Sequence, residues 1–297
     1  MDKKLEFTGE RYVPEIEEAT ISYEHWHRYL FASKLVQGKK ILDIACGEGY
    51  GSFFLAQFAQ SVVGVDYDEK SVLHAADKYR QKENLTFRVG SMTDIPIVGE
   101  GMFDAIVSFE SIEHIVEQDE FLKEVKRLLS RDGIFIASTP NRAVYSDKNK
   151  HRNPFHLKEL YFDDFKKLLE THFLSVKIMG QKIFCGSVIW SLDDVDNQKL
   201  SIENVCFSEK GISTTEKVKP SISPYFIAVA SQKKQFECSL ESIMLDSEDK
   251  LIKQFSFIRK DLEDQRGFLE KLYRSRGWRF ISFIHKVRLK IPIINKW

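Results

Sequence analysis

The stretch ILDIACGEGYGS, residues 41–52, decides the fold, because a short apolar run leads there into a group of glycines. Its first half, ILDIAC, is nearly continuous in apolar and β-branched side chains, which predicts a strand buried on both faces. Gly47, Gly49 and Gly51 follow at once, and glycine allows a backbone to approach a ligand closely. The apolar residues that come next predict a helix. Such a glycine loop is either a simple turn or a ligand-binding loop, and other segments must decide between them.

The glycine spacing separates two kinds of binding loop. The dinucleotide fingerprint G-x-G-x-x-G needs a third glycine at position 52, which is Ser52. An acidic residue, Asp43, stands four positions before the first glycine, and that fingerprint has no acid there. The loop therefore suits a positively charged ligand that lacks a pyrophosphate.

Strand-like and helix-like segments alternate along the rest of the chain. Besides the strand at residues 39–46, strands are expected at 61–67, 85–91, 103–110, 132–139, 173–184 and 224–231. Helices are expected at 21–36, 49–60, 69–81, 117–130 and 158–173. This alternation predicts an α/β fold with a parallel, doubly wound sheet.

The chain length, 297 residues, allows one α/β domain and an appendage. We expect an N-terminal segment with a cap helix at 1–38, a ligand-binding domain at 39–235 and a helical tail at 240–297. Within the domain, residues 185–223 have a polar middle and are expected to form an insertion or flap.

Composition narrows the class of protein. The formal net charge is zero, so the molecule as a whole gives no sign of a polyanionic partner. The four cysteines form no CxxC pair, which argues against a disulfide framework or a thiolate zinc site and favours the cytoplasm. The N-terminus is polar, unlike a secretory signal, and no uncharged apolar stretch reaches the roughly 20 residues that cross a bilayer. We therefore do not expect an integral membrane protein.

Polar side chains follow three further predicted strands. Asp66 ends the second strand, where a carboxylate can accept both hydroxyls of a ribose, and Tyr67 can pack on a purine ring. A short polar loop, residues 91–94, follows the third strand, and Glu110 ends the fourth. Ligands of open α/β sheets bind at the carboxyl ends of the strands, so these residues predict a nucleoside-containing ligand.

These features, in this order, resemble the class I S-adenosylmethionine-dependent methyltransferase superfamily over roughly residues 23–231. The resemblance implies a Rossmann-like, seven-stranded, mostly parallel sheet whose last strand, PYFIAVAS, is reversed. It also implies that the first loop holds the methionine end of S-adenosyl-L-methionine, the acid after the second strand the ribose, and the loop after the third strand the adenine. The implied cofactor site comprises Asp43, Ala45, Cys46, Gly47, Gly49, Asp66, Tyr67, Ser91, Met92, Asp94 and Glu110.

Two glutamates and a histidine lie in SFESIEHI, at the end of the fourth strand. If the chain is helical from Ser111 onward, Glu110, Glu113 and His114 share one face and can bind a divalent cation. The alternative is that these acidic residues only complement the dipole of a helix N-terminus.

A second group of residues favours the metal. The loop STPNR follows the fifth strand, and NPFHLKEL, with His156, comes before the next helix. The layout of E-x-x-E-H, TPN loop and distal histidine resembles the ubiquinone-pathway O-methyltransferases and the small-RNA 2′-O-methyltransferases. The latter resemblance implies that Mg²⁺ or another divalent cation binds the acceptor hydroxyl, with the ligands Glu110, Glu113, His114 and His156. Without a metal, His114 or His156 is the expected general base.

The C-terminal tail has two distinct parts. In the first, apolar residues at spacings of three, four and seven predict an amphipathic helix that packs on the body of the protein or forms a homodimer through residues 250–275. In the second, residues 271–297, eight basic residues and no acidic one are mixed with Trp278, Phe280 and other apolar side chains. A basic amphipathic helix favours binding to a membrane surface, with an acidic protein partner or nonspecific RNA binding as alternatives.

The tail, together with GERYVPE, HRYLFAS and NPFHLKEL, resembles the methyltransferases of bacterial surface-glycan assembly, of the O-antigen type. This resemblance implies an enzyme at the cytoplasmic face of the membrane that methylates a sugar hydroxyl of a nucleotide- or lipid-linked glycan. The alternative acceptor is a quinone, a phenol or another small metabolite. RNA methylation is disfavoured by the zero net charge and by the lack of a basic stripe on the catalytic domain. The non-enzymatic alternative is a scaffold protein that binds the cofactor.

Overall fold

The computed structural model of the protein describes residues 19–150, 152–184, 204–208, 211–215, 223–236, 242–246 and 248–290. The chain divides into two compact units, Met1–Ile243 and Met244–Trp297. Within the described ranges, no helix combines the length and the apolar character that a membrane span requires.

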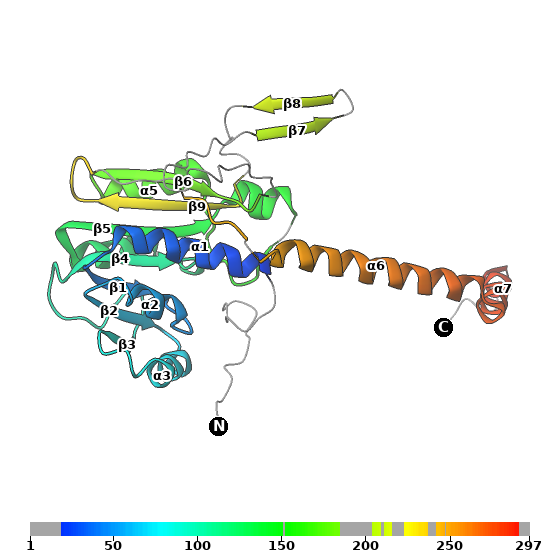
Figure 1. Ribbon diagram of the computed structural model, residues 1–297, viewed down its shortest axis with the longest axis horizontal. Coiled ribbons are helices and arrows are strands. Elements are labelled where there is room, and N and C mark those ends of the chain that lie inside the picture. Colours follow the sequence, from blue (N-terminus) through cyan, green and yellow to red (C-terminus); the bar gives the residue numbers. More distant parts are fainter. Residues whose placement is uncertain are drawn as a thin grey trace, which may run out of the picture. The chain divides into compact units, whose positions relative to one another are not determined.

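A seven-stranded sheet forms the centre of the first unit, in the order β3-β2-β1-β4-β5-β9-β6 (Figure 1). Its strands are β1 Lys40–Ile44, β2 Ser61–Asp66, β3 Leu85–Val89, β4 Phe103–Phe109, β5 Leu129–Pro140, β6 Ser175–Gln181 and β9 Tyr225–Ser231. The first five are parallel, and β9 is antiparallel to both of its neighbours. The predicted Rossmann-like sheet with a reversed last strand is therefore confirmed. The strand order reverses between β1 and β4, which is where such sheets bind ligands.

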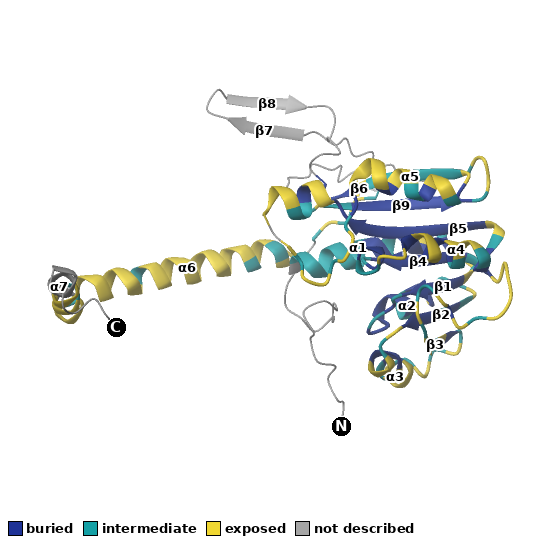
Figure 2. Cartoon of the chain, turned by 180° about the vertical axis from the view of Figure 1, so that it is seen from behind, coloured by how far each residue is buried: buried dark blue, intermediate teal, exposed yellow. Residues whose placement is uncertain are grey.

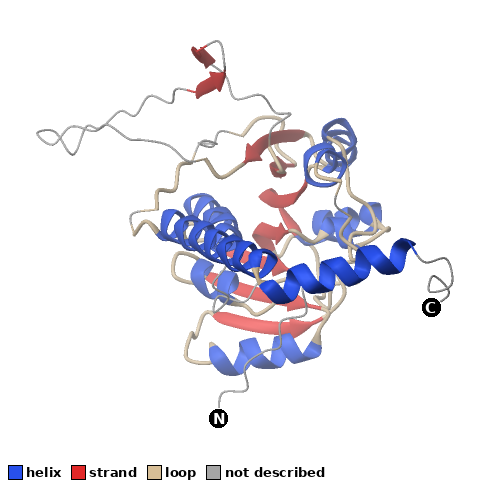
Figure 3. Cartoon of the chain, turned by 90° about the vertical axis from the view of Figure 1, so that its right-hand side faces the viewer, coloured by secondary structure: helices blue, strands red, loops and turns tan. Residues whose placement is uncertain are grey.

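Helices lie on both sides of this sheet (Figure 3). They are α1 Ala19–Leu35, α2 Tyr50–Leu55, α3 Glu69–Lys78, α4 Gln118–Leu128 and α5 Phe162–His172. Successive residues of β1 enter different core clusters: Leu42 packs in the cluster of Phe121 and Phe165, and Ile41 in that of Tyr29. Because successive strand residues point to opposite faces, β1 is buried on both sides, as its apolar run predicted.

The segment before α5 is where the predicted boundaries differ most from the structure. A helix was expected from residue 158, but α5 begins at Phe162. The amides of Leu157 and Lys158 donate to the carbonyl oxygen of Glu113 at 2.9 and 3.0 Å, and Leu160 forms a bridge to Asn141. The Leu160 carbonyl accepts a hydrogen bond from the amide of Arg142 at 3.2 Å. A helix from residue 158 would use that carbonyl for its own hydrogen bond, so α5 begins only after it.

The predicted insertion at residues 185–223 lies largely outside the described residues. Within it, β7 Asn204–Ser208 and β8 Gly211–Thr215 form an antiparallel hairpin. The prediction that this insertion acts as a flap stays a prediction.

The second unit is helical, as the tail was expected to be. It contains α6 Lys250–Arg274 and α7 Arg276–Lys290, and α6 is exposed along most of its length (Figure 2). The last part of the predicted basic segment, residues 291–297, lies outside the described residues.

Candidate active site

The loop between β1 and α2 turns sharply at the reversal of the strand order. Ala45, Gly47 and Gly49 have φ angles of 58°, 55° and 87°, which glycine adopts more easily than other residues. The amide of Cys46 donates to the carbonyl of Val65 at 3.1 Å, which joins the loop to β2. Burial raises the pKa of the Cys46 thiol well above its ordinary value, so this thiol is not a reactive one. The glycine loop is thus a strained, preformed backbone rather than a simple turn.

Asp43 lies in β1, just before this loop, and is fully buried. Its Oδ2 accepts hydrogen bonds from Ser52 Oγ at 2.6 Å and from the Tyr29 hydroxyl at 3.3 Å. Burial raises the pKa of Asp43 from 3.8 to about 7, and the two hydrogen bonds oppose this rise. A cation near this carboxylate would favour its ionised form.

Asp66 ends β2 with its carboxylate held by backbone amides. The amide of Gly47 donates to Oδ2 at 2.8 Å, and that of Asp68 donates to Oδ1 at 3.0 Å. The carboxylate is therefore fixed in orientation and linked to the glycine loop. The neighbouring Tyr67 is 81% exposed, so core packing does not account for its ring.

The loop after β3 forms a tight turn at the same edge of the sheet. Ser91 and Asp94 are joined by an antiparallel bridge, and Ser91 Oγ lies 2.9 Å from Thr93 Oγ1. Met92 packs against the core, whereas Ser91 and Asp94 are exposed. The turn therefore presents its polar groups outward beside the end of β2, with which β3 pairs.

Glu48, inside the glycine loop, was not among the predicted site residues. Its buried carboxylate accepts hydrogen bonds from Lys78 Nζ at 2.6 Å and from the Tyr79 hydroxyl at 3.0 Å, and His74 Nε2 lies 3.3 Å away. A buried carboxylate needs such partners, and here they attach the loop to α3. Because the partners lie 26 to 31 residues further along the chain, the local pattern gave no signal for them.

Glu110 leaves the end of β4 in a left-handed conformation, with a φ of 48°. The shared face required a helix from Ser111 onward, and the chain makes only the three-residue 3-10 turn η1, Ile112–His114, there. Glu110 therefore does not share a helical face with the residues of that turn. Its Oε1 accepts a hydrogen bond from Ser138 Oγ at 2.6 Å and lies 3.6 Å from the guanidinium of Arg28.

Arg28, from α1, is a second residue that the sequence did not single out. It is fully buried, donates from Nε to Gln181 at 2.8 Å and lies 4.6 Å from the centre of the Tyr225 ring. The Glu110 carboxylate favours its charged form and holds its pKa above the ordinary value, although burial opposes this. An arginine within the apolar HRYLFAS segment was the available signal, because buried guanidinium groups need specific partners.

Glu113 lies fully buried in η1. Thr139 donates to its Oε2 at 3.1 Å, while its Oε1 has no hydrogen-bond partner in the described part of the chain. Burial, and next the Glu110 carboxylate, raise the pKa of Glu113 well above its ordinary value. A buried oxygen without a partner carries a free-energy cost that a bound ligand can remove.

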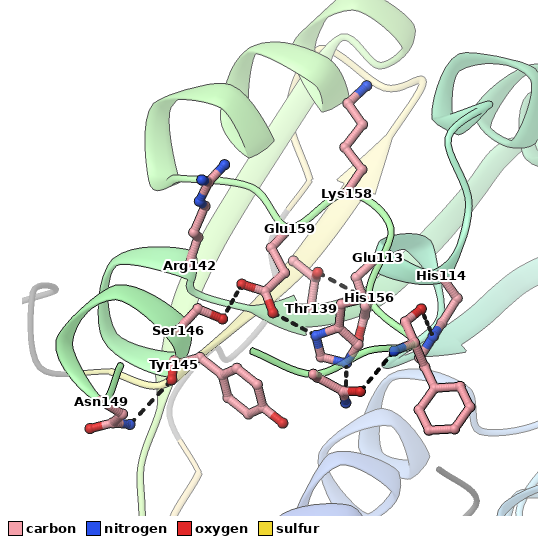
Figure 4. Close-up of polar contacts among 12 residues, drawn as sticks. Glu113, His114, Thr139, Arg142, Tyr145, Ser146, Asn149, His156, Lys158 and Glu159 are labelled. Carbon is pink, nitrogen blue, oxygen red and sulfur yellow. Dashed lines mark hydrogen bonds and ion pairs between the residues drawn. The ribbon is translucent and has the colours of Figure 1, made fainter. Parts of the chain in front are cut away.

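Two histidines near Glu113 are oriented through their Nδ1 atoms. Nδ1 of His114 lies 3.1 Å from the carbonyl oxygen of Phe155, and Nδ1 of His156 lies 2.6 Å from Oε1 of Glu159. Ser146 donates to the other oxygen of Glu159 at 2.5 Å, so Ser146, Glu159 and His156 form a line of hydrogen bonds (Figure 4). Each acceptor is an oxygen, which places the proton on Nδ1 and makes Nε2 the accepting atom of each neutral ring.

Asn153 and Tyr145 complete the surroundings of His156. Nδ2 of Asn153 donates to Nε2 of His156 at 3.0 Å, and its Oδ1 accepts from the amide of Phe155 at 3.0 Å. The ring of Tyr145 stacks on that of His156 with 5.5 Å between centroids, and lies 5.8 Å from the ring of Tyr225. A ligand of His156 Nε2 would have to replace the bond from Asn153.

Glu113, His114 and His156 converge on one point. Each offers a ligand atom, and these atoms lie within 4.8 Å of one another. One carboxylate and two imidazoles form a donor set that suits divalent transition metals. The structure thus brings together three of the four predicted metal ligands, and the fourth, Glu110, is directed to Ser138 and Arg28 instead.

Comparisons with known proteins agree with this fold and show the family. Residues 35–214 match the model of a family described as a methyltransferase domain. A protein of Mycolicibacterium smegmatis, named a probable S-adenosylmethionine-dependent methyltransferase, is 34% identical over 196 residues, which are 64% of this chain and 72% of that protein. A ubiquinone biosynthesis O-methyltransferase of Caulobacter sp. strain K31 is 31% identical over 109 residues, which are 36% of this chain and 43% of that protein.

Solved structures support the fold alone. In the complex between the Haloferax volcanii Trm112 methyltransferase activator and a methyltransferase, one chain is 16% identical to this protein. The two superpose with a TM-score of 0.53 over 71% of this chain and 92% of the other.

Proposed function

This chain belongs to the S-adenosylmethionine-dependent methyltransferases, and on that premise we propose that it methylates a hydroxyl oxygen with the help of a divalent cation. The observation that carries this proposal is the cluster of Glu113, His114 and His156, in which a buried oxygen of Glu113 has no partner within the described residues. Methylation of a hydroxyl requires that its proton be removed, and this cluster is suited to that task.

The cofactor half of the site follows from the loop and the two acids beside it. S-adenosyl-L-methionine supplies a methyl group that is already electrophilic, so the protein needs mainly to position the reactants. In this proposal Asp66, oriented by the amides of Gly47 and Asp68, accepts the ribose hydroxyls. Asp43 provides a negative charge for the cationic methionine end, in its ionised form.

The metal half rests on the chemistry of the three converging side chains. A divalent cation there would lower the pKa of an acceptor hydroxyl and hold its oxygen in place. The Phe155 carbonyl accepts a hydrogen bond from Nδ1 of His114, and the Glu159 carboxylate accepts one from Nδ1 of His156. Such outer hydrogen bonds orient metal-binding imidazoles. Two imidazoles favour Mn²⁺ or Zn²⁺ over Mg²⁺, which prefers oxygen ligands.

A metal-free version of the same site uses a histidine as general base. His156 then takes the acceptor proton on Nε2, after release of the Asn153 amide, and Glu159 stabilises the resulting cation through Nδ1. Both versions assign His156 to the acceptor side, and they differ in whether chelation affects the reaction.

Calorimetric titration of the full chain with Mn²⁺, Zn²⁺ and Mg²⁺ tests the metal. We expect one site per chain for at least one of these ions, and we expect Glu113→Gln to weaken binding on the order of 100-fold, because it removes a charged ligand. Glu117→Gln, at an exposed position just after the cluster, is the matched control and should bind as the wild type does. Failure to bind any of the three ions, together with full methyl transfer in EDTA, would contradict the metal and leave the histidine base.

For the acceptor, we propose a sugar hydroxyl of a nucleotide- or lipid-linked glycan. The half-buried ring of Tyr145 stacks on His156, and the half-buried ring of Tyr225 lies beside that of Tyr145. Tyrosine rings pack well on the apolar face of a sugar. The same rings suit a phenol or a quinone, and the likeness to ubiquinone biosynthesis O-methyltransferases supports that second class.

Labelled methyl transfer distinguishes these acceptors. Tritium from the cofactor should enter a membrane-glycan fraction if the acceptor is a sugar, and a solvent-extracted quinone fraction if it is a phenol. Label that nuclease releases would indicate RNA. Cofactor binding without transfer to any fraction would overturn the enzymatic proposal and favour a scaffold.

We also propose that α7 binds the anionic surface of the cytoplasmic membrane. Between Arg276 and Lys290 the sequence contains five lysines and arginines and no acidic residue. Phe280 and Ile281 lie about one turn before Ile284 on the helix, and the three residues are 63%, 57% and 49% exposed. Exposed apolar side chains on a basic helix are the pattern of interfacial helices that lie on anionic lipid.

A further inference from the structure

A seam of regularly spaced residues runs along α6. Starting at residue 251, the spacing alternates between four and three up to residue 272. The step of 21 positions from 251 to 272 equals three heptads. The seam consists of Leu251, Phe255, Ile258, Leu262, Gln265, Leu269 and Leu272. In heptad notation, Phe255, Leu262 and Leu269 take position a, and the other four take position d.

This seam is uncovered in the single chain. No residue of α6 is buried, and the side chains of Phe255, Leu262 and Leu269 are 47%, 59% and 45% exposed (Figure 2). Helices in proteins gain most of their stability from packing an apolar face, so a 25-residue helix with this seam needs a partner.

We propose that the partner is a second copy of this chain and that the two α6 helices pair in parallel along the seam. Gln265, the polar residue at a d position, distinguishes a parallel pair from an antiparallel pair. In a parallel pair, Gln265 meets Gln265 of the second copy, and the two amides can bond to each other although Nε2 already donates to Asp261 at 2.7 Å. In an antiparallel pair with the same seam, Gln265 meets Leu262, and a buried amide would lack a partner.

The charged residues beside the seam also favour the parallel pair. Asp261, at position g, faces Arg266, at position e, of the second copy in a parallel pair, and symmetry makes two such contacts. An antiparallel pair instead places Arg259 against Arg266, where like charges repel. The bonds of these arginines within their own helix, to Glu263 at 3.7 Å and Glu270 at 3.5 Å, are exposed ion pairs that contribute little.

Aromatic side chains extend the contact at the C-terminal end of the seam. Phe268 at position g and Tyr273 at position e, 66% and 52% exposed, become neighbours across a parallel pair. They would lose exposed apolar surface there, which favours association.

Light scattering of the full chain tests the proposal. We expect the mass of a dimer for the wild type and that of a monomer for Leu262→Asp, which places a charge in the seam. Phe257→Asp is the matched control, because Phe257 is 73% exposed and lies at position c, outside the seam. A monomeric wild type, a larger assembly, or equal disruption by both variants would overturn the proposal. Unchanged cofactor binding by Leu262→Asp would show that the first unit remains folded.

A cysteine cross-link tests the direction. Gln265→Cys brings two thiols together only in the parallel pair, so we expect a disulfide-linked dimer on mild oxidation. Lys260→Cys, at the outward position f, should not form it. A dimer that Gln265→Cys fails to cross-link would exclude the parallel direction.

Charge reversal tests the register. Asp261→Arg should weaken association about fivefold, because it replaces two attractions with two repulsions between exposed groups. Combining it with Arg266→Asp should restore the wild-type dissociation constant. Absence of this rescue would contradict the register.

Discussion

Asp43 is a carboxylate that solvent does not reach, and its pKa of about 7 leaves it divided between its charged and neutral forms near neutral pH. Desolvation disfavours the charge, while the hydrogen bonds from Ser52 and Tyr29 favour it. Burial is the larger effect, since the pKa is raised. Binding of a cationic ligand at the methionine end of the cofactor site therefore favours the ionised form of Asp43, and the neutral fraction of Asp43 loses its proton when the ligand binds.

The affinity for S-adenosyl-L-methionine should accordingly rise with pH up to about 7 and level off above it. Below that pH, Asp43 is neutral in the free protein and each unit of pH should cost up to about tenfold in affinity. Ser52→Ala should move the midpoint to higher pH, because it removes a bond to the ionised form. Calorimetry on both sides of neutrality measures both effects. Asp43→Asn should abolish the dependence, and an unchanged profile in that variant would contradict the assignment.

The stability of the folded protein changes with pH in the opposite direction to the affinity for the cofactor. The folded pKa of Asp43 lies above its ordinary value of 3.8, so the folded protein binds the proton more tightly than the unfolded chain does. This contribution to stability is complete below pH 3.8 and is lost as the pH rises through about 7. The ligand-free protein thus loses stability over the range in which it gains affinity for the cofactor.

At the scale of elements, the contact of α1 with α2 depends on one glycine. A Cβ atom on Gly51 would lie 1.9 Å from Cζ of the Tyr29 ring, so only a hydrogen fits there. Tyr29 in turn packs edge-on against the rings of Tyr50 and Phe109, at 5.4 and 5.1 Å between centroids. This contact holds α1, and with it Arg28, against the end of the sheet.

Gly51→Ala should therefore lower the free energy of unfolding by about 1–3 kcal/mol, the usual cost of overpacking a core. Alanine is the better helix former by about 1 kcal/mol, and the clash has to exceed that gain. Chemical denaturation followed by circular dichroism measures the change. Gly267→Ala is the matched control, because a Cβ at Gly267 in α6 meets nothing within 4 Å, and it should not destabilise the protein. Equal stability of Gly51→Ala and the wild type would contradict the tight contact.

The elements of the sheet were predictable because their signals are local. Apolar runs bounded by turns predicted the strands, and resemblance to a family predicted the reversed one, now β9. The geometry around Glu110 was not predictable, because it depends on a left-handed residue followed by a three-residue turn, and not on the helix that a shared face required. Contacts between distant residues, such as those of Arg28 with Glu110 and Gln181, leave no periodic pattern in the sequence.

The same reasoning explains why some residues of the candidate site were predicted from the sequence and others were not. The convergence of Glu113, His114 and His156 was expected from their motif spacing and resemblance. The supporting Glu159 was not, although it stands only three residues after His156, because charged residues are common at such positions and only the fold shows its bond to Nδ1.

At the scale of the whole molecule, the proposed pairing and the proposed membrane binding reinforce each other. A parallel α6 pair ends with two copies of α7 at the same end, because α7 begins two residues after α6. Two weak membrane-binding helices on one particle bind far more tightly than one, since the second binds at high effective concentration. Parallel pairing is thus the arrangement that best serves attachment to a surface.

Flotation of the full chain with lipid vesicles tests this attachment. The wild type should float with vesicles that contain phosphatidylglycerol and not with pure phosphatidylcholine, and high salt should reduce flotation by screening the basic residues. The double variant Ile281→Asp and Ile284→Asp should reduce binding by at least about tenfold, because each isoleucine loses its burial in the interface. Phe257→Asp, which alters an exposed apolar residue outside α7, should float normally. Equal flotation of the double variant and the wild type would show that α7 does not carry the attachment. Binding of the wild type to an acidic protein or to RNA, with no flotation, would assign the basic helix to those partners instead.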